Sequence, residues 1–216
     1  PIQAKAGKRQ VYIDIAAGES LVIQAAQSKM DAKPYAPVKT AGKAIALVGQ
    51  WRVEFIDGGP ELPGPYSSAS LGCWTNASDE KAKAFAGTAR YSLTFDLPHD
   101  VGADDYVLDL GDVRESARVR INGKNAASLF ALPMRARVGQ CLKRGLNSIE
   151  IEVTNLSANR IRDLDMRKVN WKIMHEINIV TPAYKAFDGS TWPIQPSGLL
   201  GPVTLMPVKS KQRAEL

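Results

Sequence analysis

Alternation of apolar and polar residues is the main signal along the chain, and it predicts short strands with one buried face. Near the N-terminus Val11, Ile13 and Ile15 alternate with Tyr12 and Asp14. Four later segments alternate in the same way, and because strand side chains point to opposite faces in turn, we expect their apolar members to form the core. These members are Trp51, Val53 and Phe55; Tyr91, Leu93, Phe95 and Leu97; Ala117, Val119 and Ile121; and Ile149, Ile151 and Val153.

Turn residues separate these segments, and almost no helical period is present. Gly18 predicts the turn of an N-terminal hairpin, and Pro98 ends a strand. Asn122-Gly123 predicts a two-residue type I′ hairpin, because that turn needs positive φ at both central positions. Only "ASDEKAKAF" suggests a single helical turn. The pattern favours an all-β fold, an antiparallel β-sandwich or jelly roll.

The chain divides into three parts on composition. Residues 1–44 read as a β-hairpin around Gly18 followed by a linker, "SKMDAKPYAPVKTAGKA". Residues 45–208 form the expected sandwich, and residues 209–216 form a polar tail. Within the sandwich the stretch 163–198 is too long for an ordinary connection and too apolar for a free loop. We expect Trp171 to be anchored and residues 181–192, with Tyr184, Phe187 and Trp192, to be exposed.

Composition narrows the class of protein. The chain has 216 residues, of which 44% are hydrophobic, as in ordinary globular domains. No apolar run approaches the roughly 20 residues of a membrane span. The net charge of +6 is dispersed along the chain, which disfavours a nucleic-acid ligand and would suit an acidic polysaccharide.

The chain opens at Pro1 without a signal peptide, so we expect a processed or excised piece. Cys73 and Cys141 fit either two free thiols or one disulfide.

Candidate catalytic groups are few, and the sequence predicts none with a catalytic role. Asp112 with Glu115, and Asp163 with Asp165, are close in sequence, as a glycosidase carboxylate pair could be. Both pairs lie beside arginines, so ion-paired loop carboxylates are favoured. His175-Glu176 lacks the second histidine of a zinc helix, because position 179 is Ile.

The stretch "VTNLSANRIRDLD" gathers polar side chains where a strand leaves the sheet. We expect Asn155, Asn159, Arg160 and Asp163 to brace the excursion that follows, with Arg160 as the principal donor. Sugar contact is the second interpretation. Tryptophans in or near loops could stack on sugar rings, although packing is the favoured role for them. They are Trp74, Trp171 and Trp192.

The order of several motifs resembles a known family. "GQWRVEF", "LGCWT", "FAGTARYSLTFDLP" and "YVLDLGDVRESARVRINGK" precede "LPMRARVGQCLKRGLNSIEIEVTNLSANRIRD" and "PSGLLGPVTL". This resembles the C-terminal galactose-binding-like jelly roll of family 106 glycoside hydrolases, the α-L-rhamnosidases, and more distantly the sugar-binding domains of family 2. Ala86 stands where the family often has Ser, and Ser157 where a bulky aromatic is common.

The resemblance implies a non-catalytic module, because the catalytic acids of such enzymes lie in an upstream barrel that this chain lacks. The hairpin within residues 1–44 resembles the last hairpin of the domain that precedes this module. The module would support the catalytic domain, towards which residues 181–192 would be exposed, and contact carbohydrate through Trp74, Asn159, Arg160, Asp163 and Trp192. An autonomous carbohydrate-binding module and a small glycosidase are the alternatives. The resemblance further implies an exported, periplasmic or extracellular parent enzyme. It implies no cofactor, except that related jelly rolls often hold a structural calcium ion.

Overall fold

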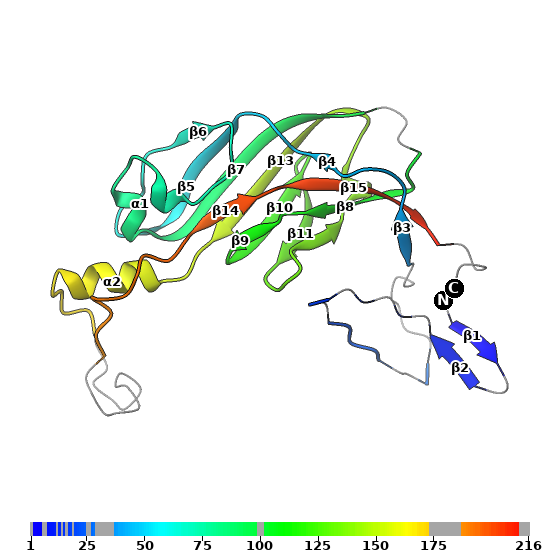
Figure 1. The fold of residues 1–216 in the computed structure, drawn as a ribbon, viewed down its shortest axis with the longest axis horizontal. Coiled ribbons are helices and arrows are strands. Elements are labelled where there is room, and N and C mark those ends of the chain that lie inside the picture. Colours follow the sequence, from blue (N-terminus) through cyan, green and yellow to red (C-terminus); the bar gives the residue numbers. More distant parts are fainter. Residues whose placement is uncertain are drawn as a thin grey trace.

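The computed structural model describes residues 2–5, 8–11, 13, 15, 17–18, 20–24, 27–28, 37–98, 102–172 and 187–211. Two antiparallel sheets pack face to face in the main body of the chain, so the expected β-sandwich is confirmed (Figure 1). The first sheet has the order β11-β10-β13-β7-β5-β6. Its strands are β5 (Trp51–Gly59), β6 (Tyr66–Ser68), β7 (Ala86–Leu97), β10 (Ser116–Ile121), β11 (Lys124–Leu129) and β13 (Gly145–Thr154).

The second sheet has the order β12-β8-β15-β3, and β4 also pairs with β15. Its strands are β3 (Val38–Thr40), β4 (Ile45–Ala46), β8 (Asp105–Asp109), β12 (Arg135–Arg137) and β15 (Thr204–Ser210). A separate pair is formed by β9 (Asp112–Arg114) and β14 (Gly198–Gly201). The sheet therefore includes a strand that precedes the boundary expected at residue 45, because Val38–Thr40 pairs with β15.

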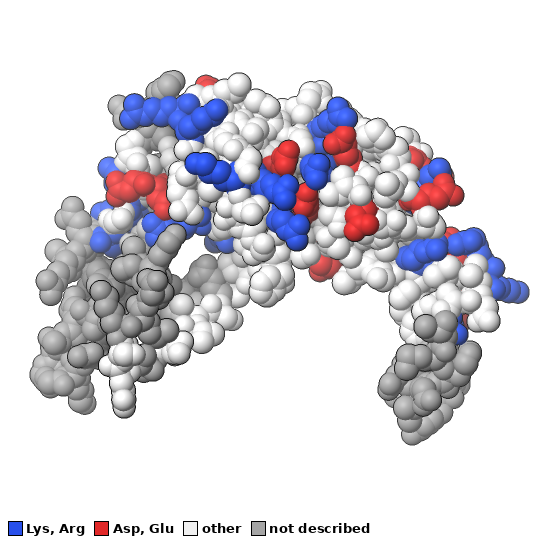
Figure 2. Space-filling view, turned by 180° about the vertical axis from the view of Figure 1, so that it is seen from behind, with Lys and Arg blue, Asp and Glu red and all other residues white. Residues whose placement is uncertain are grey.

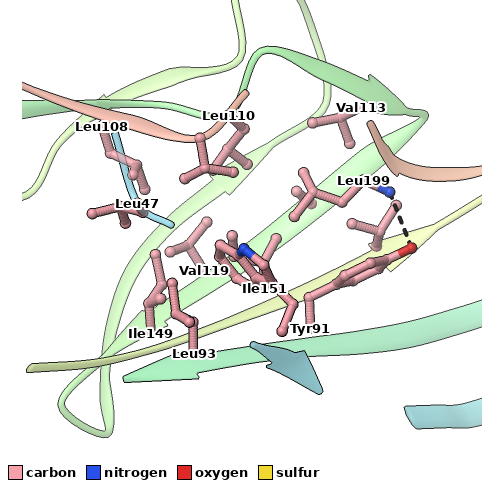
Figure 3. Packing of buried hydrophobic residues seen from close by; sticks show 14 of the residues in the cluster. Leu47, Tyr91, Leu93, Leu108, Leu110, Val113, Val119, Ile149, Ile151 and Leu199 are labelled. Atoms are coloured by element: carbon pink, nitrogen blue, oxygen red, sulfur yellow. Dashed lines mark hydrogen bonds between the residues drawn. The ribbon is translucent and has the colours of Figure 1, made fainter. Parts of the chain in front are cut away.

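Alternation places the core on the faces that the sequence predicts. Val53, Tyr91, Ile151 and Val119 lie side by side on neighbouring strands, and each is at most 1% exposed. A slip of one residue would turn each strand's apolar set to solvent, so this register is strongly specified. Figure 3 shows leucines from β8, from β14 and from the segments after β4 and β8 packing against these strands. Those labelled are Leu108, Leu199, Leu47 and Leu110.

Local turn chemistry also agrees with expectation. Asn122 and Gly123 have φ values of 52° and 75° and join β10 to β11, as a type I′ turn requires. A short helix, α1 (Lys81–Ala84), lies in the segment expected to form one helical turn. Two 3₁₀ turns, η1 (Trp74–Asn76) and η2 (Gly139–Cys141), were not expected.

The N-terminal hairpin lies earlier in the chain than expected. A hairpin is formed by β1 (Ile2–Lys5) and β2 (Lys8–Val11), whereas the described residues from 13 to 24 form no strand beside the turn at Gly18. Val22 is 93% exposed and Ile23 is 59% exposed. The alternating apolar side chains of this segment are therefore not part of the sandwich core.

Candidate functional site

The candidate site lies at the end of the sandwich where the chain leaves β13 and returns through β14 (Figure 1). The polar stretch that follows β13 forms a helix, α2 (Ala158–Met166), which the sequence analysis did not predict. Its hydrophobic signal is weak, because Ile161 and Leu164 are its only large apolar residues before Met166. Ser157, a residue type favoured at helix N-termini, precedes it and was the available signal.

Asn155 ties the start of this excursion to the sheet. Its amide oxygen accepts the N–H of Gly87 at 2.9 Å, and its amide nitrogen donates to Phe85 O and Ser197 Oγ, both at 3.0 Å. One side chain thus joins the end of β13, the start of β7 and the strand that returns. The expected brace is present at this position.

Asn159 holds the first turn of α2 in the same way. Its amide donates to Gln195 O at 2.8 Å and accepts from Gln195 N at 2.7 Å, and the side chain is buried with 2% exposure. Both amide groups are therefore used within the protein. The expectation that Asn159 contacts sugar does not fit this position, because a buried and satisfied amide is not accessible to a ligand.

Asp165 is the most enclosed carboxylate of the cluster, with a side chain that is 6% exposed. It accepts the Trp171 indole N–H at 2.7 Å and the Gly189 N–H at 2.7 Å, and it pairs with Lys172 Nζ at 3.2 Å. Lys172 Nζ also donates to Phe187 O at 2.6 Å. Asp165 and Lys172 therefore join the two ends of the segment between residues 172 and 187, a role that the sequence analysis missed.

The surroundings of Asp165 change its titration. Burial alone would raise the pKa of this carboxyl, but hydrogen bonds from Gly189 N–H, Trp171 and Lys172 outweigh burial and hold the pKa below its ordinary value. A carboxyl with a lowered pKa stays ionised at neutral pH and is unsuited to act as a general acid.

Beside Asp165 lies a cavity of about 410 Å³. Lys172 Nζ lies 5.4 Å from the ring centroids of both Trp171 and Phe187, within the range of a cation–π contact. Trp192 packs edge-on against Phe187 with centroids 5.2 Å apart, and its carbonyl accepts Arg162 Nε at 2.7 Å. The cavity thus combines aromatic surface with ammonium, carboxylate and amide groups. Its lining comprises Asp165, Met166, Lys168, Val169, Asn170, Trp171, Lys172, Phe187, Asp188 and Ser190.

Arg160 and Asp163 lie on α2 beside this cavity but do not line it. Within the part of the chain that the structure describes, Arg160 makes one ion pair, with Asp163 at 3.2 Å, and Asp163 also binds Arg167 at 2.6 Å. Side-chain exposures of 28% for Arg160 and 24% for Asp163 make this a partly solvated pair. The expectation that Arg160 is the main brace is not met among the described residues, where the bonds from this stretch to the returning segment come from Asn155, Asn159, Arg162 and Asp165.

Trp74 lies elsewhere, in the core. It is 0% exposed, and its ring meets Phe55 at 5.5 Å and Phe85 at 5.9 Å between centroids. A sugar cannot stack on a ring whose faces are covered, so the expected sugar contact at Trp74 does not fit the structure. Packing, the favoured role in the sequence analysis, applies to this tryptophan.

The remaining candidate groups have structural partners. Asp112 forms a two-pronged ion pair with Arg114, both contacts at 2.7 Å, which agrees with the ion-paired interpretation. The thiols are free; Cys141 is buried, and Cys73 Sγ accepts the Ser197 N–H at 3.1 Å. His175 and Glu176, together with Ile173, Met174, Ile177, Ile179, Val180 and Tyr184, lie outside the described residues.

The described residues contain neither a metal-binding cluster nor a membrane-spanning helix. No group of three or more His, Cys, Asp or Glu side chains there could hold a metal ion. The expectation of a structural calcium therefore gains no support from side-chain ligands in that part of the chain. None of the helices described is long and apolar enough to cross a membrane.

The lowered pKa of Asp165 predicts a pH dependence. A carboxyl whose pKa is lower in the folded state adds stability above its unfolded pKa, near 3.9, and loses it as pH falls through the folded pKa. Asp165→Asn should therefore be clearly less stable than the wild type at about pH 6, and the gap should narrow below about pH 4. Urea unfolding followed by tryptophan fluorescence measures this gap, and one that stayed constant down to about pH 2 would contradict the assignment.

The chain is similar to parts of longer proteins. No model of a known protein family matches the chain. A protein of Formosa agariphila, provisionally named a beta-glucuronidase, is 32% identical over 187 residues, which is 78% of this chain and 16% of that protein. The solved rhamnosidase of Novosphingobium sp. PP1Y is 29% identical with a TM-score of 0.59, covering 84% of this chain and 16% of that one.

A beta-glucuronidase from Ruminococcus gnavus has the same fold, with a TM-score of 0.53 and 20% identity over 77% of this chain and 29% of its own. The chain spans about one sixth of the length of its first relatives, since 16% of each is covered. It therefore corresponds to one β-sandwich domain within much longer proteins that carry the names of glycoside hydrolases.

Proposed function

We propose that this chain is a non-catalytic β-sandwich module of a polysaccharide-degrading, α-L-rhamnosidase-like glycoside hydrolase. It supports the catalytic domain and contacts carbohydrate. The observation that carries this proposal is the match to the Novosphingobium rhamnosidase, which covers 84% of this chain but only 16% of that enzyme. A small part of a long enzyme that forms a sandwich of its own is suited to an accessory role.

The state of the carboxylates supports a non-catalytic role. Glycoside hydrolysis needs one carboxyl with a raised pKa to act as the acid. Asp165 instead has a lowered pKa, and Asp112 and Asp163 are held by arginines at 2.6–2.7 Å. Their chemistry fits structural ion pairs better than proton transfer.

The cavity beside Asp165 is the place where carbohydrate contact fits best. Trp171 and Phe187 offer apolar ring surface, while Lys168 and Asn170 are exposed and can donate hydrogen bonds to hydroxyl groups. Of the residues expected to bind sugar, Trp192 contributes through its contact with Phe187. The parent enzyme would be exported, as enzymes that act on polysaccharides must meet their substrate outside the cell.

The first test is catalytic. The purified chain should not hydrolyse aryl α-L-rhamnosides or aryl β-D-glucuronides. Turnover that disappeared in Asp112→Asn or Asp163→Asn, with an unchanged circular dichroism spectrum, would instead establish a small glycosidase.

The second test concerns carbohydrate contact. Retention on immobilised neutral and acidic polysaccharides should weaken in the double variant Lys168→Ala with Asn170→Ala. Lys124→Ala, at the exposed β10–β11 turn and outside the cavity lining, serves as the matched control and should leave retention unchanged. Tight retention of the isolated wild type would favour the alternative, an autonomous carbohydrate-binding module, which the aromatic cavity also suits.

A further inference from the structure

The outer face of the six-stranded sheet carries a second hollow, whose lining shares no residue with the cavity beside Asp165. It has a volume of about 400 Å³, within the range of about 300–1,000 Å³ that small-molecule sites occupy. Ile56 lines it from β5, and Phe130 lines it from the loop after β11. We propose that this hollow, named here the sheet groove, is a glycan subsite that binds one or two pyranose rings between Ile56 and Phe130.

The floor of the sheet groove consists of two rows of side chains on neighbouring strands. Thr88, Thr154 and Ser116 form a row of hydroxyl groups, with Thr88 Oγ1 and Thr154 Oγ1 2.8 Å apart. The next row is charged: Glu152 and Arg118 line the groove, and Arg90, beside Glu152 on the next strand, lies outside the lining. Ladder hydrogen bonds fix the spacing of both rows, so the floor is formed before a ligand binds.

The two arginines beside Glu152 bind its carboxylate unequally. Glu152, with 11% side-chain exposure, is bound closely by Arg90 at 2.8 Å and loosely by Arg118 at 3.5 Å. Arg118 keeps 62% of its side chain exposed. Because a guanidinium group has five N–H donors, Arg118 retains donors that face the groove. Figure 2 shows positive and negative side chains interleaved across the body of the molecule, viewed from behind.

Phe130 supplies the apolar wall. Its side chain is 83% exposed, although Ile15 and Leu21 of the N-terminal segment lie near it in an adjoining hollow. The other aromatic rings of the described residues are buried or partly buried, so Phe130 stands out by its exposure. Its face can cover the C–H face of a sugar ring, while the hydroxyl and charged rows bond the ring's hydroxyl groups.

The chemistry of the groove favours a glycan over a purely apolar or a strongly anionic ligand. Asp57 and Glu152 oppose a dense negative charge, and Arg118 accommodates a single carboxylate or several hydroxyl groups. A neutral or singly charged pyranose fits both conditions. The choice of a carbohydrate as ligand rests on the proposed function. The sheet groove itself is separate from the cavity beside Asp165.

The experiment is an NMR titration of the ¹⁵N-labelled full chain with L-rhamnose and D-glucuronate, the sugars suggested by the names of the relatives. We expect saturable shifts of the backbone amides of Thr88, Ser116, Ser128 and Thr154. Phe130→Ala should weaken binding about tenfold, and Arg118→Ala should do so similarly. Matched controls are Leu132→Ala, an exposed apolar residue of the same loop, and Arg120→Ala, the next outward arginine of β10; neither lines the groove.

Several results would overturn the inference. They are the absence of saturable shifts with both sugars, equal weakening by the control variants, and shifts confined to Trp171 and its neighbours. The last would support only the cavity beside Asp165. A change of oligomeric state in Phe130→Ala, with sugar binding intact, would assign Phe130 to a protein contact instead. Hydrolysis of a glycoside by the chain would refute the proposed non-catalytic function but would not change the sugar-induced shifts of these amides. Failure of the proposed function and failure of the groove inference are therefore distinguishable.

Discussion

Replacement of Asp165 by Ala should destabilise the chain by about 3 kcal/mol, the lower end of the cost of breaking a buried ion pair. Three donors, Trp171 Nε1, Lys172 Nζ and Gly189 N, would lose their acceptor at once. Lys172 keeps 25% of its side chain exposed and can recover some hydration, which is why the lower end applies. For a domain of this size the loss corresponds to a decrease in melting temperature of about 6–12 °C.

Thermal unfolding followed by circular dichroism measures this decrease, and Asp163→Ala is the control on the same helix. Asp163 also binds two basic side chains, Arg160 and Arg167, but its side chain is four times as exposed as that of Asp165, 24% against 6%. We expect the control to cost less than about 1 kcal/mol, as partly solvated pairs do. Equal losses in both variants would show that Asp165 does not join the two ends of the segment.

Gly87→Ala should have an effect at least as large, because β5 and β7 approach closely at this point. A Cβ atom at Gly87 would lie 2.1 Å from Asp57 O and 2.6 Å from Gly58 Cα, on a backbone with φ of 157°. Neither contact can relax without parting the two strands. We therefore expect a loss of at least about 3 kcal/mol, together with displacement of Asn155, which accepts the Gly87 N–H.

The neighbouring Gly59→Ala provides the control for this variant. Gly59 lies on the same strand pair, and a Cβ atom there would meet nothing within 4 Å. Its effect should stay within about 0.5 kcal/mol, as for ordinary surface changes. Urea unfolding of both variants measures the difference, and comparable midpoints would contradict the close approach of Gly87 to β5.

The strands and their buried faces could be predicted from sequence because their signal is local. In β10, for example, Ala117, Val119 and Ile121 alternate with arginines, and all three are at most 5% exposed. The turn at Asn122-Gly123 is equally local, since positive φ is a property of two adjacent residues. Val11, Ile13 and Ile15 also alternate with polar residues, yet they lie outside the core. Alternation predicts that a strand has an apolar face, but it does not predict which segment packs on that face.

The candidate site could be predicted only in part. The polar stretch after β13 was correctly taken as a brace, and Asn155 and Asn159 brace it as expected, but Arg160 was given the principal role and Asp165 was missed. The guanidinium group of Arg160 has more N–H donors than an asparagine amide, and this favoured Arg160 in the sequence analysis. The bracing residues are instead those whose side chains point towards the returning segment. Asp165 reaches Gly189, which is 24 positions away, and no pattern within α2 contains that information.

The sequence by itself therefore determined the strand content, the core face of each strand and the β10–β11 turn, since each depends on neighbouring residues. Only the tertiary structure decided that Trp74 is a core residue, that α2 is a helix held by buried amides, and that Asp165 joins Trp171 to Gly189. Those outcomes depend on contacts between distant segments. A weakly amphipathic helix such as α2 owes its stability to such contacts more than to its own propensity.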